Sequence, residues 1–270
     1  MDKEFEGKVV LITGGSRGLG RAMAHGFAAQ GANLAIASRS LESCESTADD
    51  IRALGVQAEA YSVHVGHWDE LDQLVEAVYD RFGQIDVLIN NAGMSPLYES
   101  LDDVSESLFD KVIGVNLKGP FRLMANVGQR MQDSGGGSII NVSSTASVSA
   151  SPNSEPYGAA KAGLNALTRS FASAYGPAVR VNCIMAGPFL TDISKAWDME
   201  VFNQRAAANI PMASIESVKT RANRVTLLSS PILPNPTKRP LTIRATKANG
   251  IRRVELRMDI SSKSKKSGFK

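Results

Sequence analysis

The stretch Lys8-Val9-Val10-Leu11-Ile12-Thr13-Gly14-Gly15-Ser16-Arg17-Gly18-Leu19-Gly20 joins an apolar run to a glycine-rich turn. The apolar part is rich in β-branched residues, which is typical of a strand in a buried parallel sheet. The alanine-rich segment from about Arg21 to Gln30 predicts a helix that ends at Gly31. A strand, a glycine turn and a helix N-terminus together form an anion site, because bare N–H groups and the helix dipole point at the same place. The residues that we expect to hold a pyrophosphate there are Gly14, Ser16, Arg17, Gly18, Leu19 and Gly20.

Further apolar runs of strand length follow along the chain. They alternate with helix-like segments about every 25 to 30 residues, which predicts βαβ crossovers and a parallel sheet. The expected fold is α/β, a Rossmann-like doubly wound parallel sheet with helices on both faces. One long helix is expected from about Glu106 to Gln132. The later strands are expected at Asn33–Ser38, Ala58–Val63, Ile85–Asn90, Ser138–Ser143 and Val179–Ile184.

The end of the second expected strand indicates which dinucleotide is bound. An acid about 20 residues after the glycines usually binds the ribose 2′-hydroxyl, but Ser38 and Arg39 occupy this place. A guanidinium group pairs with a 2′-phosphate, and Arg17 in the glycine turn adds a second positive charge. These residues favour NADP over NAD. The alternative for Arg39 is a solvated loop arginine.

The stretch from Ser144 to Lys161 carries the residue types needed for proton transfer. Tyr157 and Lys161 are four residues apart, so they share one helix face. An ammonium group near a phenol of ordinary pKa about 10 stabilises the phenolate and makes the tyrosine a usable acid near neutral pH. Ser144 ends an apolar run, and ligands bind outside the carboxyl ends of such strands. Asn116 lies inside the long expected helix, where asparagine is unfavourable, so it is either a structural tie or a site group.

Two other kinds of site are disfavoured by the histidines. His64 and His67 lack further ligands, since the only other histidine is His25 and no cysteine is near in sequence, so we expect no metal site. Gly14-x-Ser16-x-Gly18 also fits the nucleophile elbow of α/β-hydrolases. That fold needs a histidine late in the chain, and none follows His67.

Charge divides the chain near Met212. Residues 213–270 hold 14 Lys/Arg and 3 acids, whereas residues 1–212 hold 16 basic and 24 acidic residues. We expect a catalytic domain at 1–212 and an anomalous segment at 213–270 that is poorly packed, with a disordered basic tail at Ser261–Lys270. The abrupt change indicates a shifted reading frame or a gene fusion. A functional nucleic-acid-binding tail is the less favoured alternative.

The location of the protein is expected to be cytoplasmic. Cys44 and Cys183 lie far apart in sequence, which indicates reduced thiols. Met1–Glu6 lacks the apolar region of a secretory signal, and no run reaches the roughly 18 apolar residues of a membrane span.

Four linked motifs resemble the short-chain dehydrogenase/reductase family. Thr13–Gly20, spaced G-x-x-x-G-x-G, is similar to its cofactor loop, and Asn90-Asn91-Ala92-Gly93 to its motif after the fourth strand. Asn182 and Gly187–Thr191 are similar to its segment over the nicotinamide. The residues similar to its catalytic tetrad are Asn116, Ser144, Tyr157 and Lys161.

The resemblance implies hydride transfer between NAD(P)H and a small carbonyl or alcohol substrate. By that similarity Tyr157 protonates the carbonyl oxygen, Lys161 lowers the tyrosine pKa and binds the nicotinamide ribose, and Ser144 orients the substrate. By the same similarity Asn116 would hold a water of the proton relay. The further cofactor-binding residues that it implies are Asn91, Ala92, Gly93, Gly187 and Thr191.

Three departures from the family pattern qualify these expectations. His64-Val65 replaces an aspartate and a small apolar residue that contact adenine, and Ala186-Gly187 replaces a Pro-Gly pair. After Met212 the usual acid-bearing helix, seventh strand and glycine-rich end are missing. The resemblance implies a homo-oligomer, which this C-terminal segment disfavours. The alternative function is a catalytically impaired NADP-binding protein.

Overall fold

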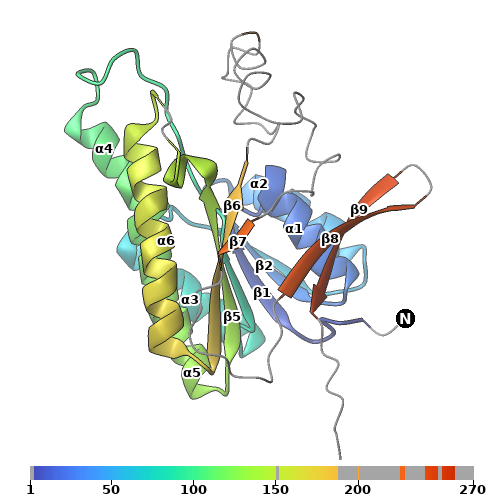
Figure 1. The fold of residues 1–270 in the computed structure, drawn as a ribbon. Coiled ribbons are helices and arrows are strands. Elements are labelled where there is room, and N and C mark those ends of the chain that lie inside the picture. The colour runs from blue at the N-terminus through green and yellow to red at the C-terminus, as the bar shows by residue number, and fades with distance from the viewer. Residues whose placement is uncertain are drawn as a thin grey trace, which may run out of the picture.

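The computed structural model describes residues 3–149, 152–187 and 200, and the backbone of 226–228, 241–248 and 251–258. Its central element is a twisted sheet with strand order β3-β2-β1-β4-β5-β6-β7 (Figure 1). The first six strands in this order are mutually parallel. A crossover connects each of these six to the next of them along the chain, as parallel pairing requires. Their bounds are β1 Val9–Thr13, β2 Asn33–Ser38, β3 Ala58–Ser62, β4 Val87–Asn90, β5 Gly137–Ser144 and β6 Val179–Ala186.

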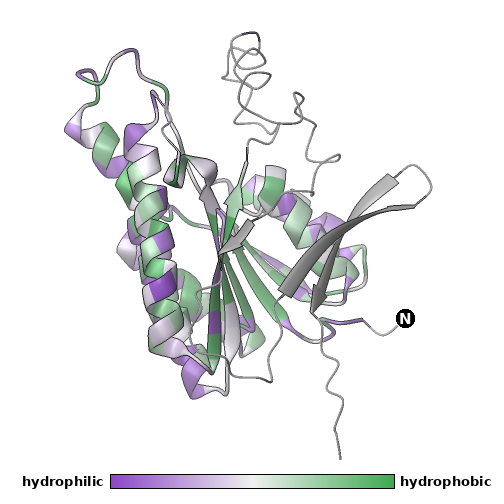
Figure 2. Cartoon of the chain, viewed as in Figure 1, coloured by the Kyte–Doolittle hydropathy of each residue, from purple (hydrophilic) through white to green (hydrophobic). Residues whose placement is uncertain are grey.

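Helices cover both faces of this sheet. Alternate side chains of each strand point to opposite faces, so Val10 and Ile12 pack against α1 and α2, whereas Leu11 packs on the other side. Figure 2 shows the apolar colour gathered on the central strands. The expected doubly wound Rossmann-like fold is confirmed. The helices are α1 Gly18–Ala29, α2 Leu41–Arg52, α3 Trp68–Phe82, α4 Glu106–Ile113, α5 Gly119–Asp133 and α6 Glu155–Tyr175.

The prediction of a single long helix after β4 is wrong in one respect. A π-helical turn, Gly114–Lys118, separates α4 from α5 and contains Asn116. Asn116 Nδ2 donates to Val112 O at 2.9 Å, in competition with the backbone pattern of an α-helix. A Cβ atom on Gly119 would lie 2.0 Å from Val65 O, so the segment after β3 presses against this turn. π turns of this kind are frequent at functional sites.

The open edge of the sheet differs from the expectation. We expected no strand beside β6, but the short strand β7, Thr226–Leu228, pairs antiparallel with it along Cys183–Met185. An open strand edge presents unpaired N–H and C=O groups that any extended segment can bind, which accounts for this pairing without a family-like sequence. β8, Leu241–Ala248, and β9, Ile251–Met258, form a separate antiparallel pair. The domain boundary at Met212 and the tail Ser261–Lys270 lie outside the described residues.

No helix in the described part of the chain is long and apolar enough to cross a membrane.

Candidate active site

The glycine turn after β1 has the geometry of a phosphate cradle. Gly14 and Gly18 have φ angles of +65° and +53°, which an L side chain rarely adopts. At Gly20 a Cβ atom would lie 2.1 Å from Gly14 O, so α1 can start this close to the turn only with glycine here. The turn therefore exposes backbone N–H groups next to the N-terminus of α1, as an anion site requires.

The ends of β1 and β4 are locked together behind this turn. Thr13 Oγ1 accepts hydrogen bonds from Asn91 N at 3.1 Å and Ala92 N at 3.2 Å, and Asn91 Nδ2 donates to Thr13 O and Gly14 O, each at 3.0 Å. Asn91, Ala92 and Gly93 are predicted cofactor-binding residues, and they lie beside the glycine turn. Thr13, predicted only as part of the glycine-turn motif, is a positioning residue for these groups.

Two arginines lie at the edge where a ribose 2′-group is expected. Ser38 Oγ donates to Ser16 Oγ at 2.9 Å, which joins the end of β2 to the glycine turn. Ser62 Oγ donates to Arg39 O at 3.2 Å and fixes the backbone after β2. The side chains of Arg17 and Arg39 are exposed, and neither forms an ion pair with a carboxylate of the described residues. Both charges are thus available to an anionic ligand.

His64 is held in a defined orientation after β3. Its Nδ1 accepts from Gly66 N at 3.2 Å, and its ring stacks on His67 with centroids 4.2 Å apart. Glu70 accepts from His64 N and is hydrogen-bonded to His67 Nδ1, each at 2.6 Å. Burial lowers the pKa of His64, and the positive charges of His67 and Arg39 lower it further. Within the described chain there is no group of three or more residues able to hold a metal.

Ser144, Tyr157 and Lys161 meet at the carboxyl edge of β5. Lys161 Nζ lies over the Tyr157 ring, 5.7 Å from its centroid, and donates to Val142 O at 2.8 Å. Burial raises the pKa of Tyr157, and its hydrogen bond with Ser144 opposes this rise. We expected Lys161 to lower this pKa, but in the structure desolvation of the phenolate is the larger effect.

Asn116 belongs to the same cluster. Its Nδ2 donates to Met94 O at 2.8 Å and its Oδ1 accepts from Met94 N at 3.3 Å, so it ties the π turn to the segment after β4. A Cβ atom built on Gly93 would lie 3.0 Å from Asn116 Oδ1 and 3.7 Å from Lys161 Nζ. Asn116 is therefore a structural tie that also lies near Lys161, and its role as a site group stays a prediction.

A buried polar chain supports the cluster and was missed from the sequence. Asn90 Nδ2 donates to Asn141 Oδ1, and Asn141 Nδ2 donates to Thr168 Oγ1, each at 2.9 Å. These three residues link β4, β5 and α6 through the sheet interior, where unpaired polar groups are costly. One signal in the sequence could have indicated this chain: each of two apolar strands contains an asparagine, and in the sheet Asn90 lies opposite Asn141.

The remaining predicted residues have different outcomes. Leu19 and Val65 pack against the two cores, and Gly187 follows the end of β6. Thr191 lies outside the described residues, as does most of the segment predicted to close over the nicotinamide.

Burial of Lys161 predicts an unusual pH dependence of stability. Its pKa is lowered from 10.5 to about 8, mainly by burial. Below pH 8 both the native and the unfolded chain bind this proton. Between about pH 8 and 10.5 only the unfolded chain keeps it, so the free energy of unfolding rises with pH because of this group. The difference in unfolding free energy between the parent and Lys161→Met should change by about 3 kcal/mol in favour of the parent across this range. Urea unfolding of both proteins at pH 7, 8, 9 and 10 measures it, and parallel pH profiles would contradict it.

This fold, with a glycine turn, a strand-end serine and a tyrosine–lysine pair on one helix, defines a dehydrogenase of the short-chain class. The chain belongs to this family, because the family model described as short chain dehydrogenase matches residues 8–201. Its members are oxidoreductases that bind nicotinamide cofactors and act on alcohol or carbonyl groups.

Individual relatives support the same class. An uncharacterized oxidoreductase of Thermotoga maritima is 40% identical over 184 residues, which is 68% of this chain and 72% of that protein. An L-rhamnose 1-dehydrogenase (NAD(P)(+)) of Azotobacter vinelandii is 35% identical over 231 residues, 83% of this chain and 90% of that protein. The crystal structure of a putative short-chain alcohol dehydrogenase from Sinorhizobium meliloti 1021 superposes with a TM-score of 0.75 at 32% identity, covering 80% of this chain and 86% of that one.

Proposed function

We propose that this oxidoreductase uses NADP and transfers hydride between the nicotinamide and a carbonyl or alcohol of a small molecule. The observation that carries the cofactor choice is the pair of exposed arginines, Arg17 and Arg39, beside Ser38 at the end of β2. An acid at this position would bind a ribose 2′-hydroxyl and repel a 2′-phosphate. Guanidinium groups instead pair with phosphate through two parallel hydrogen bonds.

The proposed roles of the side chains follow from their places around Tyr157. The bound nicotinamide supplies or accepts the hydride. Tyr157 donates its hydroxyl proton to the substrate oxygen during reduction and takes it back during oxidation. Ser144, hydrogen-bonded to Tyr157, orients that oxygen. Lys161 holds the nicotinamide ribose, and its positive charge stabilises the tyrosinate left after proton transfer. Asn116 holds a relay water beside it.

The adenosine end of the cofactor is proposed to bind along the ends of β2 and β3. His64 and Val65 replace the usual aspartate and small apolar residue there, and His64 carries no negative charge. The Glu70 carboxylate still lies at this end of β3, where it is hydrogen-bonded to His64 N and His67 Nδ1, so the cofactor choice rests on the two arginines.

A catalytically impaired NADP-binding protein is the second candidate. It is supported by the replacement of the family sequence after Met212, where the strand beside β6 has only three residues. The two candidates differ in turnover and agree in cofactor binding. Hydride transfer from NADPH to a panel of ketones and aldehydes separates them: a chain that binds NADPH and reduces none of them is the impaired protein.

The domain division, location and assembly are also proposals. We propose a catalytic domain at 1–212 and a distinct segment at 213–270, which limited proteolysis tests through early cleavage near Met212. The two free cysteines, Cys44 and Cys183, are both buried thiols, in keeping with a reducing, cytoplasmic location. A homo-oligomer of the family kind, which light scattering measures, is less favoured because of the altered C-terminal segment.

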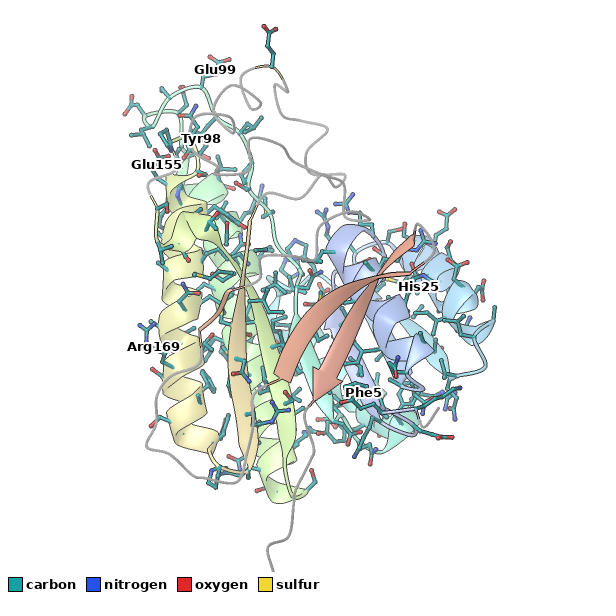
Figure 3. The ribbon with its side chains drawn as sticks, turned by 45° about the vertical axis from the view of Figure 1, so that its right-hand side comes forward. Phe5, His25, Tyr98, Glu99, Glu155 and Arg169 are labelled. Carbon is teal, nitrogen blue, oxygen red and sulfur yellow. The ribbon has the colours of Figure 1, made fainter. Side chains whose placement is uncertain are left out.

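Replacing Arg39 by aspartate tests the cofactor proposal. A charge-assisted guanidinium–phosphate pair is worth roughly 1.5–3 kcal/mol, so Arg39→Asp should weaken NADPH binding roughly 10- to 100-fold. The new acid should not weaken NADH binding, because it can accept a hydrogen bond from the ribose 2′-hydroxyl. Dissociation constants from NAD(P)H fluorescence measure both. The control is Arg169→Asp, which makes the same charge change on the outer side of α6 (Figure 3). Equal affinities of the parent for NADPH and NADH would overturn the proposal.

A further inference from the structure

A chain of polar side chains joins β6 and α6 to the turn that follows Ser144. The Cys183 thiol donates to Asn165 Oδ1 at 3.3 Å, and Asn165 Nδ2 donates to Ser147 Oγ at 2.8 Å. Ser147 Oγ in turn donates to Ser144 O at 2.6 Å. Cys183 and Asn165 are only 1% and 6% exposed, so water cannot replace their bonds without opening the core. The chain therefore runs from the core to the backbone of the residue that is proposed to orient the substrate oxygen.

The direction of each hydrogen bond in this chain is set by the group before it. The thiol offers its proton to Asn165 Oδ1, so the amide turns Nδ2 toward Ser147. Ser147 Oγ accepts from that amide and keeps one proton of its own. Two acceptors lie within reach of this proton, Ser144 O at 2.6 Å and Met185 Sδ at 3.5 Å. A thioether is a weak acceptor compared with a carbonyl oxygen, so the proton goes to Ser144 O.

The bond to Ser144 O holds the turn in which Ser144 is fixed. Ser144 is the last residue of β5, and the chain passes there into a 3₁₀ turn, Thr145–Ser147. Ser144 Oγ accepts from Ala146 N at 3.2 Å inside this turn, which leaves its own hydroxyl proton for a partner outside the turn. A Cβ atom on Gly158 would lie 3.0 Å from Ala146 O, so the turn also packs against α6 at the residue after Tyr157. A shift of the turn would therefore change the distance between the hydroxyl groups of Ser144 and Tyr157.

We propose that Ser147 and Asn165 are positioning residues for Ser144, and that the Cys183 thiol sets the orientation of the Asn165 amide. The inference rests on the proposed function, since it takes Ser144 as the residue that orients the substrate oxygen. The alternative is that the chain only satisfies buried polar groups and stabilises the fold. The two explanations differ in one respect. Only positioning predicts that loss of the Ser147 hydroxyl weakens the hydrogen bond between Ser144 and Tyr157.

The NMR signal of the Tyr157 Cζ atom tests the proposal without any need for turnover. The chain has five tyrosines, and after labelling with [ζ-¹³C]tyrosine the signal of Tyr157 is the one that disappears in Tyr157→Phe. Ser144→Ala gives the chemical shift of Tyr157 without its hydrogen bond to Ser144. Ser147→Ala should move the Tyr157 signal toward that value, because the turn that fixes Ser144 is released.

Two variants serve as controls for Ser147→Ala. Ser147→Thr keeps the hydroxyl group and should keep the Tyr157 signal at its parental position. Ser170→Ala makes the same change at an exposed position of α6, where the hydroxyl donates to Ala166 O at 3.2 Å, and should also leave the signal unmoved. An unmoved Tyr157 signal in folded Ser147→Ala, or an equal movement in Ser170→Ala, would overturn the inference.

The Cys183 thiol gives a second test, which also decides the question if Ser147→Ala does not fold. Cys183→Ala removes the proton donor to Asn165 Oδ1, so the amide can turn away from Ser147. Cys183→Ser keeps a donor at this position. The Tyr157 signal should therefore move in Cys183→Ala and stay near its parental position in Cys183→Ser. The same signal position in both variants would show that the thiol does not orient the amide.

Kinetics separate failure of the inference from failure of the proposed function. In a parent that reduces a ketone or aldehyde with NADPH, Ser147→Ala should lower kcat about 10- to 100-fold, because a small displacement of an orienting group is costly in the transition state. The dissociation constant for NADPH should change less than about twofold, and Ser147→Thr should restore kcat. Parental kcat in Ser147→Ala would overturn the inference. If the Tyr157 signal moves as expected but the parent reduces no ketone or aldehyde, the positioning of Ser144 stands and the proposed function fails.

Discussion

Tyr157→Phe should lower kcat about 10²–10⁴-fold, which is the usual contribution of a general acid, while the dissociation constant for NADPH changes less than about twofold. The substitution keeps the ring beneath Lys161 Nζ and removes only the hydroxyl that is hydrogen-bonded to Ser144. The substrate oxygen would then have to take its proton from water. Steady-state reduction, with NADPH, of the ketone or aldehyde that the parent reduces fastest, together with a fluorescence titration of NADPH, measures the two quantities separately.

Tyr175→Phe is the matched control for this prediction. Tyr175 lies on the same helix, and its hydroxyl donates to Ala125 O at 3.1 Å, away from the site. Its loss should lower the free energy of unfolding by about 1 kcal/mol and leave kcat unchanged. A Tyr157→Phe variant that keeps more than about a tenth of the parental kcat would show that another residue donates the proton.

Gly20→Ala should lower the free energy of unfolding by about 3 kcal/mol and abolish NADPH binding, because overpacking against backbone atoms cannot be relieved by a side-chain rotation. The new Cβ would lie 2.1 Å from Gly14 O and 2.5 Å from Asn91 Nδ2. It would therefore push apart the turn and the asparagine that holds it. Urea unfolding followed by circular dichroism gives the stability.

Gly26→Ala is the control on the same helix. A Cβ atom there has no heavy atom within 4 Å apart from those of its own helix, so the change should be neutral or should raise stability by up to about 1 kcal/mol through helix propensity. Equal unfolding free energies for the two variants would contradict the prediction, because they would show that a Cβ atom at residue 20 fits between α1 and the turn without a clash.

The strands and the glycine turn were predictable because their signals are local. The apolar run ending at Thr13 and the turn Gly14–Gly20 are contiguous in the chain, and a buried parallel strand needs nothing more than a continuous run of such residues. The pairing of Tyr157 with Lys161 is also local, since residues four apart on a helix are always neighbours. The structure confirms the α/β fold predicted from these signals. It also brings Ser144, Tyr157 and Lys161 together.

Residues that act through neighbours distant in sequence escaped prediction. Asn141 matters because it connects Asn90 with Thr168, and Ser147 matters because it binds Asn165, 18 residues away. The π turn around Asn116 also depends on a distant contact, the approach of Val65 to Gly119. No pattern within a window of ordinary helix or strand length contains both members of such a pair.

The sequence by itself determined the order of strands and helices, the glycine turn and the candidate proton-transfer residues, because each depends on spacing along a few residues of chain. The tertiary structure alone decided how those residues ionise. Spacing predicted that Lys161 lowers the pKa of Tyr157. Packing instead buries both groups, which raises the pKa of Tyr157 and lowers the pKa of Lys161, so that the neutral form of each is favoured. The cost of desolvating a charge depends on everything that surrounds it in space, and a linear sequence does not contain that information.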